Sequence, residues 1–282
     1  MANIQIPIRN AGIRAERAVR QQAPALETIA RIGFLAKGVV YIVIGFLALE
    51  AAFSNGGKTT NSQGALENIV QQPFGRFLLG IVGIGLAAYA LWRFVQAGLD
   101  TENKDSDATG VLTRIGFILS GIAYGALAVT ALRILRGTGG SGSQTTQDWT
   151  IQLMAHPVGP WLIGLLGLIV IGLACGQIVK GWKTKFTKHL AMNEMSARQK
   201  RIAVAMGKWG HIARGIVFFI MGGFLVEAAL HTNPAQAKGL GSALDLLSVQ
   251  SFGPILLGLV AAGLMAYGAY MFIEARWRRV SL

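Results

Sequence analysis

Six segments of this chain are long and apolar enough to cross a lipid bilayer as helices. A spanning helix needs roughly 20 mostly apolar residues to cross about 30 Å of hydrocarbon. Soluble domains carry about 25% charged residues, whereas this chain carries 14% and cannot cover a soluble surface. The sequence therefore predicts an all-α transmembrane protein. Its six spans are expected at about residues 32–53, 75–98, 114–135, 158–180, 209–230 and 253–275.

The first, third and fifth spans share one pattern of glycines. A shift of 83 residues along the chain places Gly38 on Gly121, and a shift of 177 places Gly38 on Gly215. The longer shift also places Gly45 on Gly222. Matches at near-constant offsets indicate an internal duplication rather than a shared membrane composition.

The second, fourth and sixth spans also begin alike. Their first residues read PFGRFLLGIVG (73–83), PVGPWLIGLLG (157–167) and SFGPILLGLVA (251–261). Each is preceded by a similar loop with a short amphipathic segment, which we expect to lie in the membrane interface. The chain is thus predicted to contain three two-helix hairpin repeats. Because two spans return the chain to its starting side, the repeats are parallel and should surround a pseudo-threefold axis along the membrane normal.

Lysine and arginine are distributed unequally between the two sides of the membrane. Near the span ends, 18 of these residues lie on one side and five on the other, which predicts that both termini are cytoplasmic. The net charge of +13 comes without any nucleic-acid-binding motif, so no nucleic-acid partner is expected. Anionic lipids at the cytoplasmic face are the expected partners, together with a possible membrane-protein partner.

These repeats divide the chain into five predicted parts. A basic cytoplasmic segment (1–29), which has no apolar core and is not a signal peptide, precedes repeat 1 (30–100). Repeat 2 covers residues 111–183 and repeat 3 covers residues 207–282. A basic cytoplasmic linker (184–206) joins the last two repeats.

The combined motifs of the odd and even spans resemble those of a known family. The odd spans carry G-x(4)-G-x-x-[YF], and the even spans follow P-[FV]-G-x(4)-G, except at Ser251, which replaces the proline in the third repeat. Over residues 30–280 the chain resembles the bacterial membrane family called domain of unknown function 1206. The resemblance implies six spans in a bacterial cytoplasmic (inner) or thylakoid membrane. It implies no reaction, substrate or catalytic residue.

The glycines of the odd spans form a stripe along each helix. Gly38 and Gly45 are seven residues apart, as are Gly215 and Gly222, and Gly121 begins the matching stripe in repeat 2. Seven residues are close to two helical turns, so each pair lies on one face. Small residues allow helices to approach closely in lipid. We interpret the stripe as a packing seam; a channel lining is the alternative.

An inner tier of polar residues lies about two turns from the cytoplasmic end of the odd spans. It consists of the equivalent residues Lys37, Ser120 and Arg214. A charge within the bilayer costs a few kcal/mol on insertion scales, so such residues require a functional hypothesis. In one interpretation, Lys37 and Arg214 snorkel toward cytoplasmic head groups. In the other, the tier forms a gate or a lipid site.

An outer tier lies near the opposite end of the same spans. It consists of Glu50, Arg133 and Glu227, which could form an ion-paired cluster that links the three hairpins or could simply reach the outer interface. Residues 37 and 50 lie about 140° apart around a straight helix. At most one tier can therefore line a shared central path.

Few residues suggest chemistry. His211 is the histidine expected inside a span, and we interpret it as a tolerated polar residue rather than a ligand. Arg93 and Glu274 are expected at the cytoplasmic interface. Paired transmembrane histidines that could hold a haem are absent from the sequence, as are the common catalytic motifs. We therefore expect no enzyme activity, no metal and no cofactor.

Two function hypotheses follow. The sparse intramembrane polarity favours a non-enzymatic scaffold or accessory subunit of a membrane complex. The alternative is a small channel or carrier whose pathway follows the pseudo-threefold axis. Binding of anionic lipid by the basic linker is compatible with both hypotheses.

Overall fold

The computed structural model describes residues 23–53, 59–99, 108–138 and 145–278. Within these ranges, six helices are long and apolar enough to cross a membrane, as the sequence predicts. The basic segment predicted at residues 1–29 lies mostly outside the described residues. The long helices are α2 (Ala23–Phe53), α4 (Gly75–Leu99), α5 (Ala108–Leu135), α7 (Gly159–Trp182), α8 (Ala197–Leu230) and α10 (Gly253–Trp277).

A short helix precedes each even span, at the three places where the sequence predicts short amphipathic segments. The short helices are α3 (Ser62–Gln71), α6 (Thr145–Met154) and α9 (Leu240–Ser248). Each turns directly into its spanning helix at the first glycine of that helix. A Cβ on these glycines would overlap a carbonyl oxygen near the end of the short helix. The repeated glycine therefore allows the sharp turn between the two helices.

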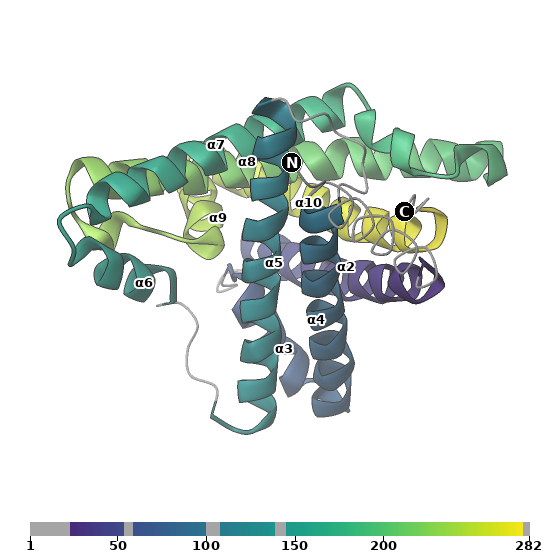
Figure 1. Ribbon diagram of the computed structural model, residues 1–282, viewed down its shortest axis with the longest axis horizontal. Helices are drawn as coiled ribbons and strands as arrows, with labels where there is room; N and C mark the ends of the chain where they lie inside the picture. Colours follow the sequence, from purple (N-terminus) through teal and green to yellow (C-terminus); the bar gives the residue numbers. More distant parts are fainter. Residues whose placement is uncertain (1–22, 54–58, 100–107, 139–144, 279–282) are drawn as a thin grey trace, which may run out of the picture.

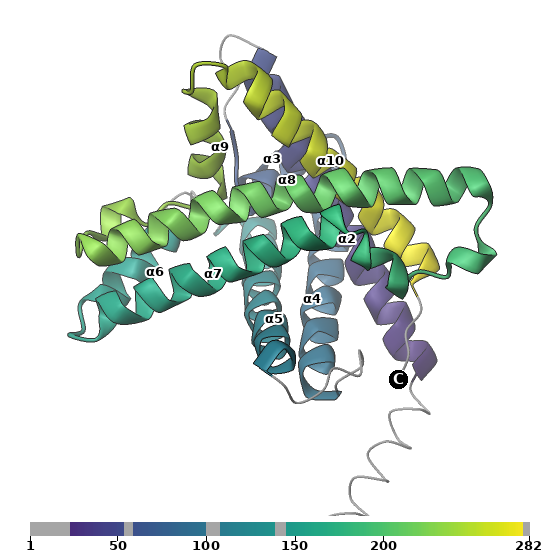
Figure 2. The ribbon, with the colours of Figure 1, turned by 90° about the horizontal axis from the view of Figure 1, so that it is seen from above.

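The repeats pack through pairs of helices from neighbouring repeats. The most extensive packing joins α7 to α8, α10 to α2 and α4 to α5. Each pair combines the second spanning helix of one repeat with the first spanning helix of another. Figures 1 and 2 show α7 beside α8 and α2 beside α10, while α4 and α5 cross the α7–α8 pair steeply. The three pairs are equivalent under the repeat, but their axes are not aligned with one another.

The structure places the glycine stripes between the helices of two such pairs. A Cβ on Gly38 would meet the carbonyl oxygen of Gly268 at 2.9 Å, and one on Gly45 would meet that of Ala261 at 2.8 Å. In the α7–α8 pair, Cβ atoms at the equivalent glycines would meet carbonyl oxygens at 3.0 Å. Those two glycines are Gly215 and Gly222. In repeat 2, a Cβ on Gly121 would meet the ring of Phe94 at 2.9 Å.

Repeats 1 and 3 are also packed hairpins, but repeat 2 is not. Helix α4 packs on α2 through a contact between two small residues, Gly85 and Ala36. The equivalent contact in repeat 3 joins Gly263 to Ala213. In contrast, α5 and α7 do not pack extensively on each other. The predicted hairpin of repeat 2 is therefore open, because larger residues occupy these positions. They are Leu119 and Ile169.

The predicted linker between repeats 2 and 3 is partly helical. Helix α8 begins at Ala197, where Ser196 and Gln199 form a capping box. The irregular linker therefore covers only residues 183–196. It contains two 3₁₀ helices, η1 (Lys185–His189) and η2 (Met192–Glu194), and its backbone nitrogen at Ala191 donates to the carbonyl oxygen of Trp277 over 2.8 Å. The linker thus folds back onto the end of α10.

Two adjacent glycines of α8 provide a matched test of the close packing. A Cβ on Gly222 would lie 2.6 Å from Ile171 Cγ1, whereas a Cβ on Gly223 meets nothing within 4 Å. We expect Gly222→Ala to lower the free energy of unfolding by about 1–3 kcal/mol through overpacking. Gly223→Ala should leave it unchanged or raise it by up to about 1 kcal/mol. Thermal unfolding in detergent measures both, and equal effects of the two variants would contradict the packing.

Candidate functional site

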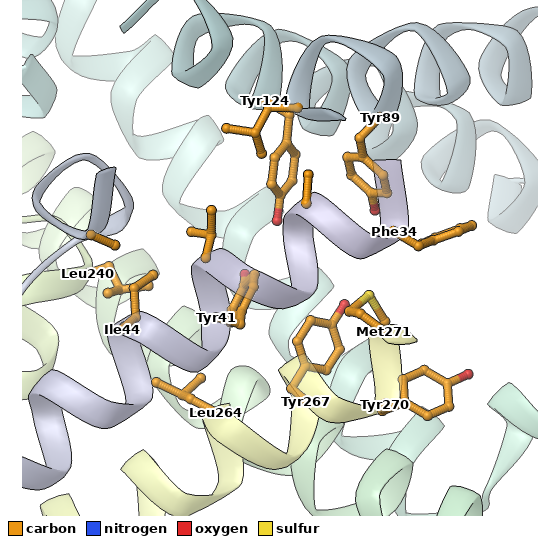
Figure 3. Packing of buried hydrophobic residues seen from close by; sticks show 14 of the residues in the cluster. Phe34, Tyr41, Ile44, Tyr89, Tyr124, Leu240, Leu264, Tyr267, Tyr270 and Met271 are labelled. Atoms are coloured by element: carbon orange, nitrogen blue, oxygen red, sulfur yellow. The ribbon is translucent and has the colours of Figure 1, made fainter. Parts of the chain in front are cut away.

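Lys37 lies inside the helix bundle, surrounded by tyrosines. Its side chain is fully buried, and its Nζ donates a hydrogen bond to the hydroxyl of Tyr89 over 2.7 Å. The Nζ atom also lies within 6.0 Å of the centres of four tyrosine rings from four helices. We call these residues the tyrosine cage; it consists of Tyr41, Tyr89, Tyr124 and Tyr267. Figure 3 shows them gathered around α2.

Arg214 of α8 joins the same cage. Its Nε donates to the hydroxyl of Tyr41, and its Nη1 donates to the hydroxyl of Tyr267, each over 3.0 Å. The guanidinium carbon lies 4.5 Å from the ring centre of Phe218. Both Lys37 and Arg214 are therefore held by the rings and hydroxyls of the same tyrosines.

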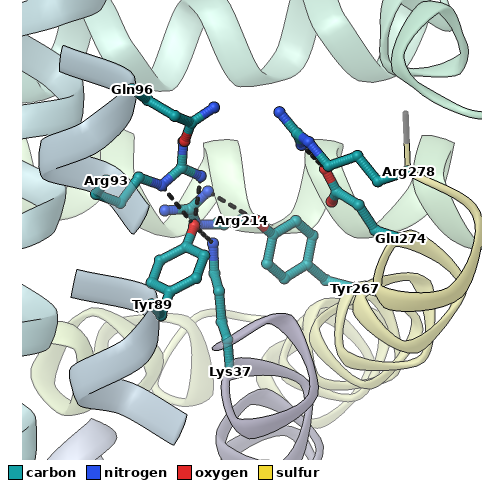
Figure 4. A network of polar contacts seen from close by, with 8 residues as sticks. All are labelled: Lys37, Tyr89, Arg93, Gln96, Arg214, Tyr267, Glu274 and Arg278. Carbon is teal, nitrogen blue, oxygen red and sulfur yellow. Dashed lines mark hydrogen bonds and ion pairs between the residues drawn. The ribbon is translucent and has the colours of Figure 1, made fainter. Parts of the chain in front are cut away.

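Arg93 of α4 is the third cation at this site. Its Nε donates to the hydroxyl of Tyr89 over 2.8 Å, and its Nη1 donates to Gln96 Oε1 over 2.8 Å. Its guanidinium carbon lies 5.1 Å from the ring centre of Phe117 on α5. Figure 4 shows that Lys37 and Arg93 approach the same hydroxyl of Tyr89. We call Lys37, Arg93 and Arg214 the basic cluster.

The site contains far more hydrogen-bond donors than acceptors. Lysine and arginine side chains can only donate, and each tyrosine hydroxyl that accepts a bond still carries a proton to donate. Three hydroxyls of the cage accept bonds from the basic cluster. Tyr124 is 7% exposed, and its hydroxyl can also donate a hydrogen bond. The tyrosine protons and the cations therefore form a set of converging donors.

No carboxylate of the described residues forms an ion pair with the basic cluster. The nearby carboxylate of Glu274 is paired with Arg278, the residue that follows the end of α10, as Figure 4 shows. Removing a charge from water costs several kcal/mol even after relaxation. Each cation–π contact restores up to about 2 kcal/mol when it is desolvated, but the rings do not neutralise the charge. The site is therefore positive, rich in donors and suited to an anion.

The cage is built from equivalent positions of the repeats. Lys37 and Arg214 are equivalent in the odd spans, and Tyr41 is equivalent to Tyr124. In the even spans, shifts of 84 and 178 residues align Tyr89 with Leu173 and Tyr267. Repeats 1 and 3 thus supply cations and tyrosines that converge on one site. Repeat 2 supplies the rings of Tyr124 and Phe117, both on α5, and no cation.

Comparison with known proteins identifies the repeat architecture. The family model described as Domain of Unknown Function (DUF1206) matches residues 32–100, 115–184 and 209–278. The chain belongs to this family. It is 33% identical to "Uncharacterized protein YxxB" of Bacillus subtilis (strain 168) over 262 residues, which are 93% of this chain and 94% of the relative. No solved structure matches the chain. The matches confirm the predicted family and its three tandem repeats.

The inner tier of the DUF1206 repeats does not snorkel. Lys37 is 0% exposed and Arg214 is 8% exposed, and both bond to tyrosines inside the bundle. The interpretation as cytoplasmic anchors is therefore wrong, because phenol hydroxyls and ring faces bind the two cations in place of head groups. Ser120, the equivalent residue of repeat 2, is half-buried and makes no hydrogen bond to the cage among the described residues. Two of the three inner-tier residues, Lys37 and Arg214, thus meet at the tyrosine cage.

The outer tier does not form an ion-paired cluster. Glu50, Arg133 and Glu227 are all exposed, and no ion pair joins them to one another in the described part of the chain. The reason is that α2, α5 and α8 do not pack extensively on one another, so residues near their outer ends stay apart. The buried inner tier and the exposed outer tier agree with their angular separation of about 140°.

Three residues outside the predicted tiers also belong to this region. Arg93, expected at the interface, is part of the basic cluster, and Glu274 is buried with Arg278. His211 is buried; its Nδ1 lies 2.7 Å from the carbonyl oxygen of Gly207, and Phe186 of the linker stacks on its ring. The alignment of Tyr89 with Tyr267, 178 residues apart in equivalent spans, is the signal in the sequence that points to this site.

The site is closed by side chains at both ends. Toward the linker, the ring of Phe186 packs 5.1 Å from that of Tyr270 and is 1% exposed. Toward the other end of α2, buried aliphatic side chains follow the cage, as Figure 3 shows. They include Ile44, Leu240 and Leu264. Lys37 and Arg214 are therefore enclosed by side chains, whereas Arg93 is half-buried.

Two substitutions at one hydrogen bond should change stability in opposite directions. Lys37→Met removes a buried charge that is surrounded by like charges, so we expect a higher unfolding temperature in a buffer whose only anion is chloride. Tyr89→Phe removes the acceptor of Lys37 and Arg93 and should lower the free energy of unfolding by about 1–3 kcal/mol. Thermal unfolding in detergent measures both. If Lys37→Met loses as much stability as Tyr89→Phe, the charge of Lys37 is already compensated and this interpretation is wrong.

Proposed function

We propose that this membrane protein is a non-enzymatic carrier that binds an anion at the basic cluster. The observation that supports the proposal is the convergence of Lys37, Arg93 and Arg214 without an ion-paired carboxylate among the described residues. Buried charges in proteins are normally paired, and charges within membrane spans generally mark ligand or ion pathways. An anion among the three cations would supply the missing acceptors.

The enclosed position of the site favours a carrier over an open channel. The linker side chain of Phe186 covers one end, and aliphatic side chains such as Leu264 and Ile44 cover the other. A channel requires a continuous polar path, whereas a carrier exposes an enclosed site alternately to each side. The site also lies between equivalent repeats, where the carriers of other folds hold their substrates.

The surface of the linker fits an anionic membrane face. Lys183, Lys185 and Lys188 are exposed around the buried Phe186. Each basic residue near an anionic surface contributes about 1 kcal/mol to attachment. We therefore propose that this end lies at the cytoplasmic face of a bacterial membrane and contacts anionic lipids, in agreement with the positive-inside distribution.

A scaffold or accessory subunit is the second candidate function. The hypothesis rested on sparse polarity inside the spans, and the basic cluster weakens that argument. One observation still favours it: the apolar windows of α5 and α7 are 17% buried, against 56% for those of α2 and α10. A partner helix could cover the two exposed helices. Native purification with mass spectrometry tests this candidate, which fails if the chain always migrates without a partner.

The carrier proposal predicts binding that depends on the basic cluster. Inorganic phosphate and succinate, added separately to the purified protein, should raise the unfolding temperature, and at least one should enter proteoliposomes. Arg214→Gln should reduce both effects about tenfold or more, because one charge-assisted contact contributes roughly 1.5–3 kcal/mol. Arg133→Gln is the matched control, since Arg133 is exposed in the equivalent helix of repeat 2.

The control should behave like the unmodified protein in both assays. Uptake that is equal in Arg214→Gln and Arg133→Gln would exclude the basic cluster from transport. Binding without uptake would exclude the carrier while leaving an anion-binding role.

A further inference from the structure

We infer that the ligand of this site is an anionic amphiphile that enters sideways from the bilayer, between α5 and α7. Its carboxylate or phosphate head would bind the basic cluster, and its hydrocarbon chain would pass between the two helices into the lipid. The inference rests on the proposed anion site and names the class of its ligand.

The packing of repeat 2 differs from that of the other two repeats. Gly85 touches Ala36 where α4 meets α2, and Gly263 touches Ala213 where α10 meets α8. At the equivalent positions, α7 carries Ile169 and α5 carries Leu119, and both side chains are half-buried. Small residues allow helix backbones to approach, whereas branched aliphatic residues hold them apart. The described parts of α5 and α7 therefore remain without extensive packing on each other.

The polar lining of the site is interrupted on this same side. Leu173 of α7 occupies the position that Tyr89 and Tyr267 occupy in the other repeats. Ser120 of α5 stands where those repeats have Lys37 and Arg214. The side of the site that repeat 2 forms is thus uncharged and largely apolar. A hydrocarbon chain suits such a side, whereas the phosphate or carboxylate group suits the other two.

Tyr124 connects the open side to the basic cluster. It belongs to α5, its ring centre lies 4.6 Å from that of Tyr89, and Lys37 Nζ lies 5.3 Å from its ring. The residue is 7% exposed, and its hydroxyl can donate a hydrogen bond to a head group. About two turns away on the same helix, a Cβ on Gly116 would lie 3.1 Å from Leu173 Cδ2. The donors and the apolar side are therefore contiguous.

Lateral entry agrees with the closure of the other sides. Phe186 covers the linker end, Leu264 and its neighbours cover the opposite end, and small-residue contacts seal repeats 1 and 3. A hydrated anion would have to lose its water before it passed these side chains. An amphiphile already resides in the bilayer, and its chain can stay in hydrocarbon while its head group moves to the cations. This route requires the least desolvation.

The length of the hydrocarbon chain provides the first test. Wild-type protein in phosphatidylcholine nanodiscs is titrated with dodecyl phosphate and, separately, with inorganic phosphate, against protein-free nanodiscs. We expect dodecyl phosphate to bind about tenfold more tightly or better. Equal affinities would overturn the inference and leave the anion site standing. Absence of binding by both probes would overturn the proposed function as well.

A variant that closes the open side separates specific entry from simple partition into the bilayer. Leu119→Ala/Ile169→Gly recreates the small-residue contact of the other repeats. It should weaken dodecyl phosphate binding about tenfold and leave inorganic phosphate binding unchanged. Ile118→Ala/Leu168→Gly is the matched control on neighbouring exposed residues and should bind like wild type. If dodecyl phosphate binds equally to both double variants, the entry route is wrong.

A third measurement uses only the unmodified chain, so it does not depend on the folding of variants. A dodecyl phosphate analogue with a photoreactive diazirine near its chain end is irradiated in the nanodiscs. Labelled peptides should come from residues 115–124 and 165–177. Labelling confined to α2 and α10 would contradict the route. Recovery of a second protein chain cross-linked to α5 and α7 would show that a partner covers this side instead.

Discussion

Cations that are buried among tyrosine rings must be held by groups that only partly replace water. Phenol hydroxyls accept hydrogen bonds from Lys37, Arg93 and Arg214, and the ring faces attract their charge, but neither cancels it. The geometry that this requires is demanding, because Tyr89 and Tyr267 have to reach the axis from different helices. Gly33 and Gly210 permit it: a Cβ on either would lie 2.5–2.6 Å from a tyrosine Cα. The tyrosines that hold the basic cluster therefore depend on the repeated glycines.

Much of this fold could be predicted from the sequence, because its determinants are local. Hydropathy and length locate the six spans, repeated offsets locate the three repeats, and amphipathic segments locate α3, α6 and α9. The direction of Lys37 could not be predicted in the same way. A lysine two turns inside a span can extend to head groups or turn inward, and the choice depends on Tyr89, which lies 52 residues away. Only the tertiary contact decides between them.

The open packing of repeat 2 also has a signal in the sequence, but that signal can be interpreted only when the helix contacts are known. The replacement of Gly85 and Gly263 by Ile169 is visible in any alignment of the repeats. However, nothing in the sequence shows that these glycines face Ala36 and Ala213 rather than lipid. Helix faces in a membrane protein are hard to distinguish, because lipid-facing and protein-facing residues are both apolar. The opening in repeat 2 therefore emerges from the structure.

The divergence of repeat 2 affects charge and packing at the same place. A symmetric ring would have added a third inner-tier cation at Ser120 and a tyrosine at Leu173, and it would have enclosed the axis on every side. Repulsion among the cations would then rise, and no side of the site would adjoin the lipid. Loss of the cation at Ser120 lowers the repulsion, while Leu119 and Ile169 separate the helices beside it. A single divergent repeat thus makes the buried charge easier to hold and leaves one side of the site open to the bilayer.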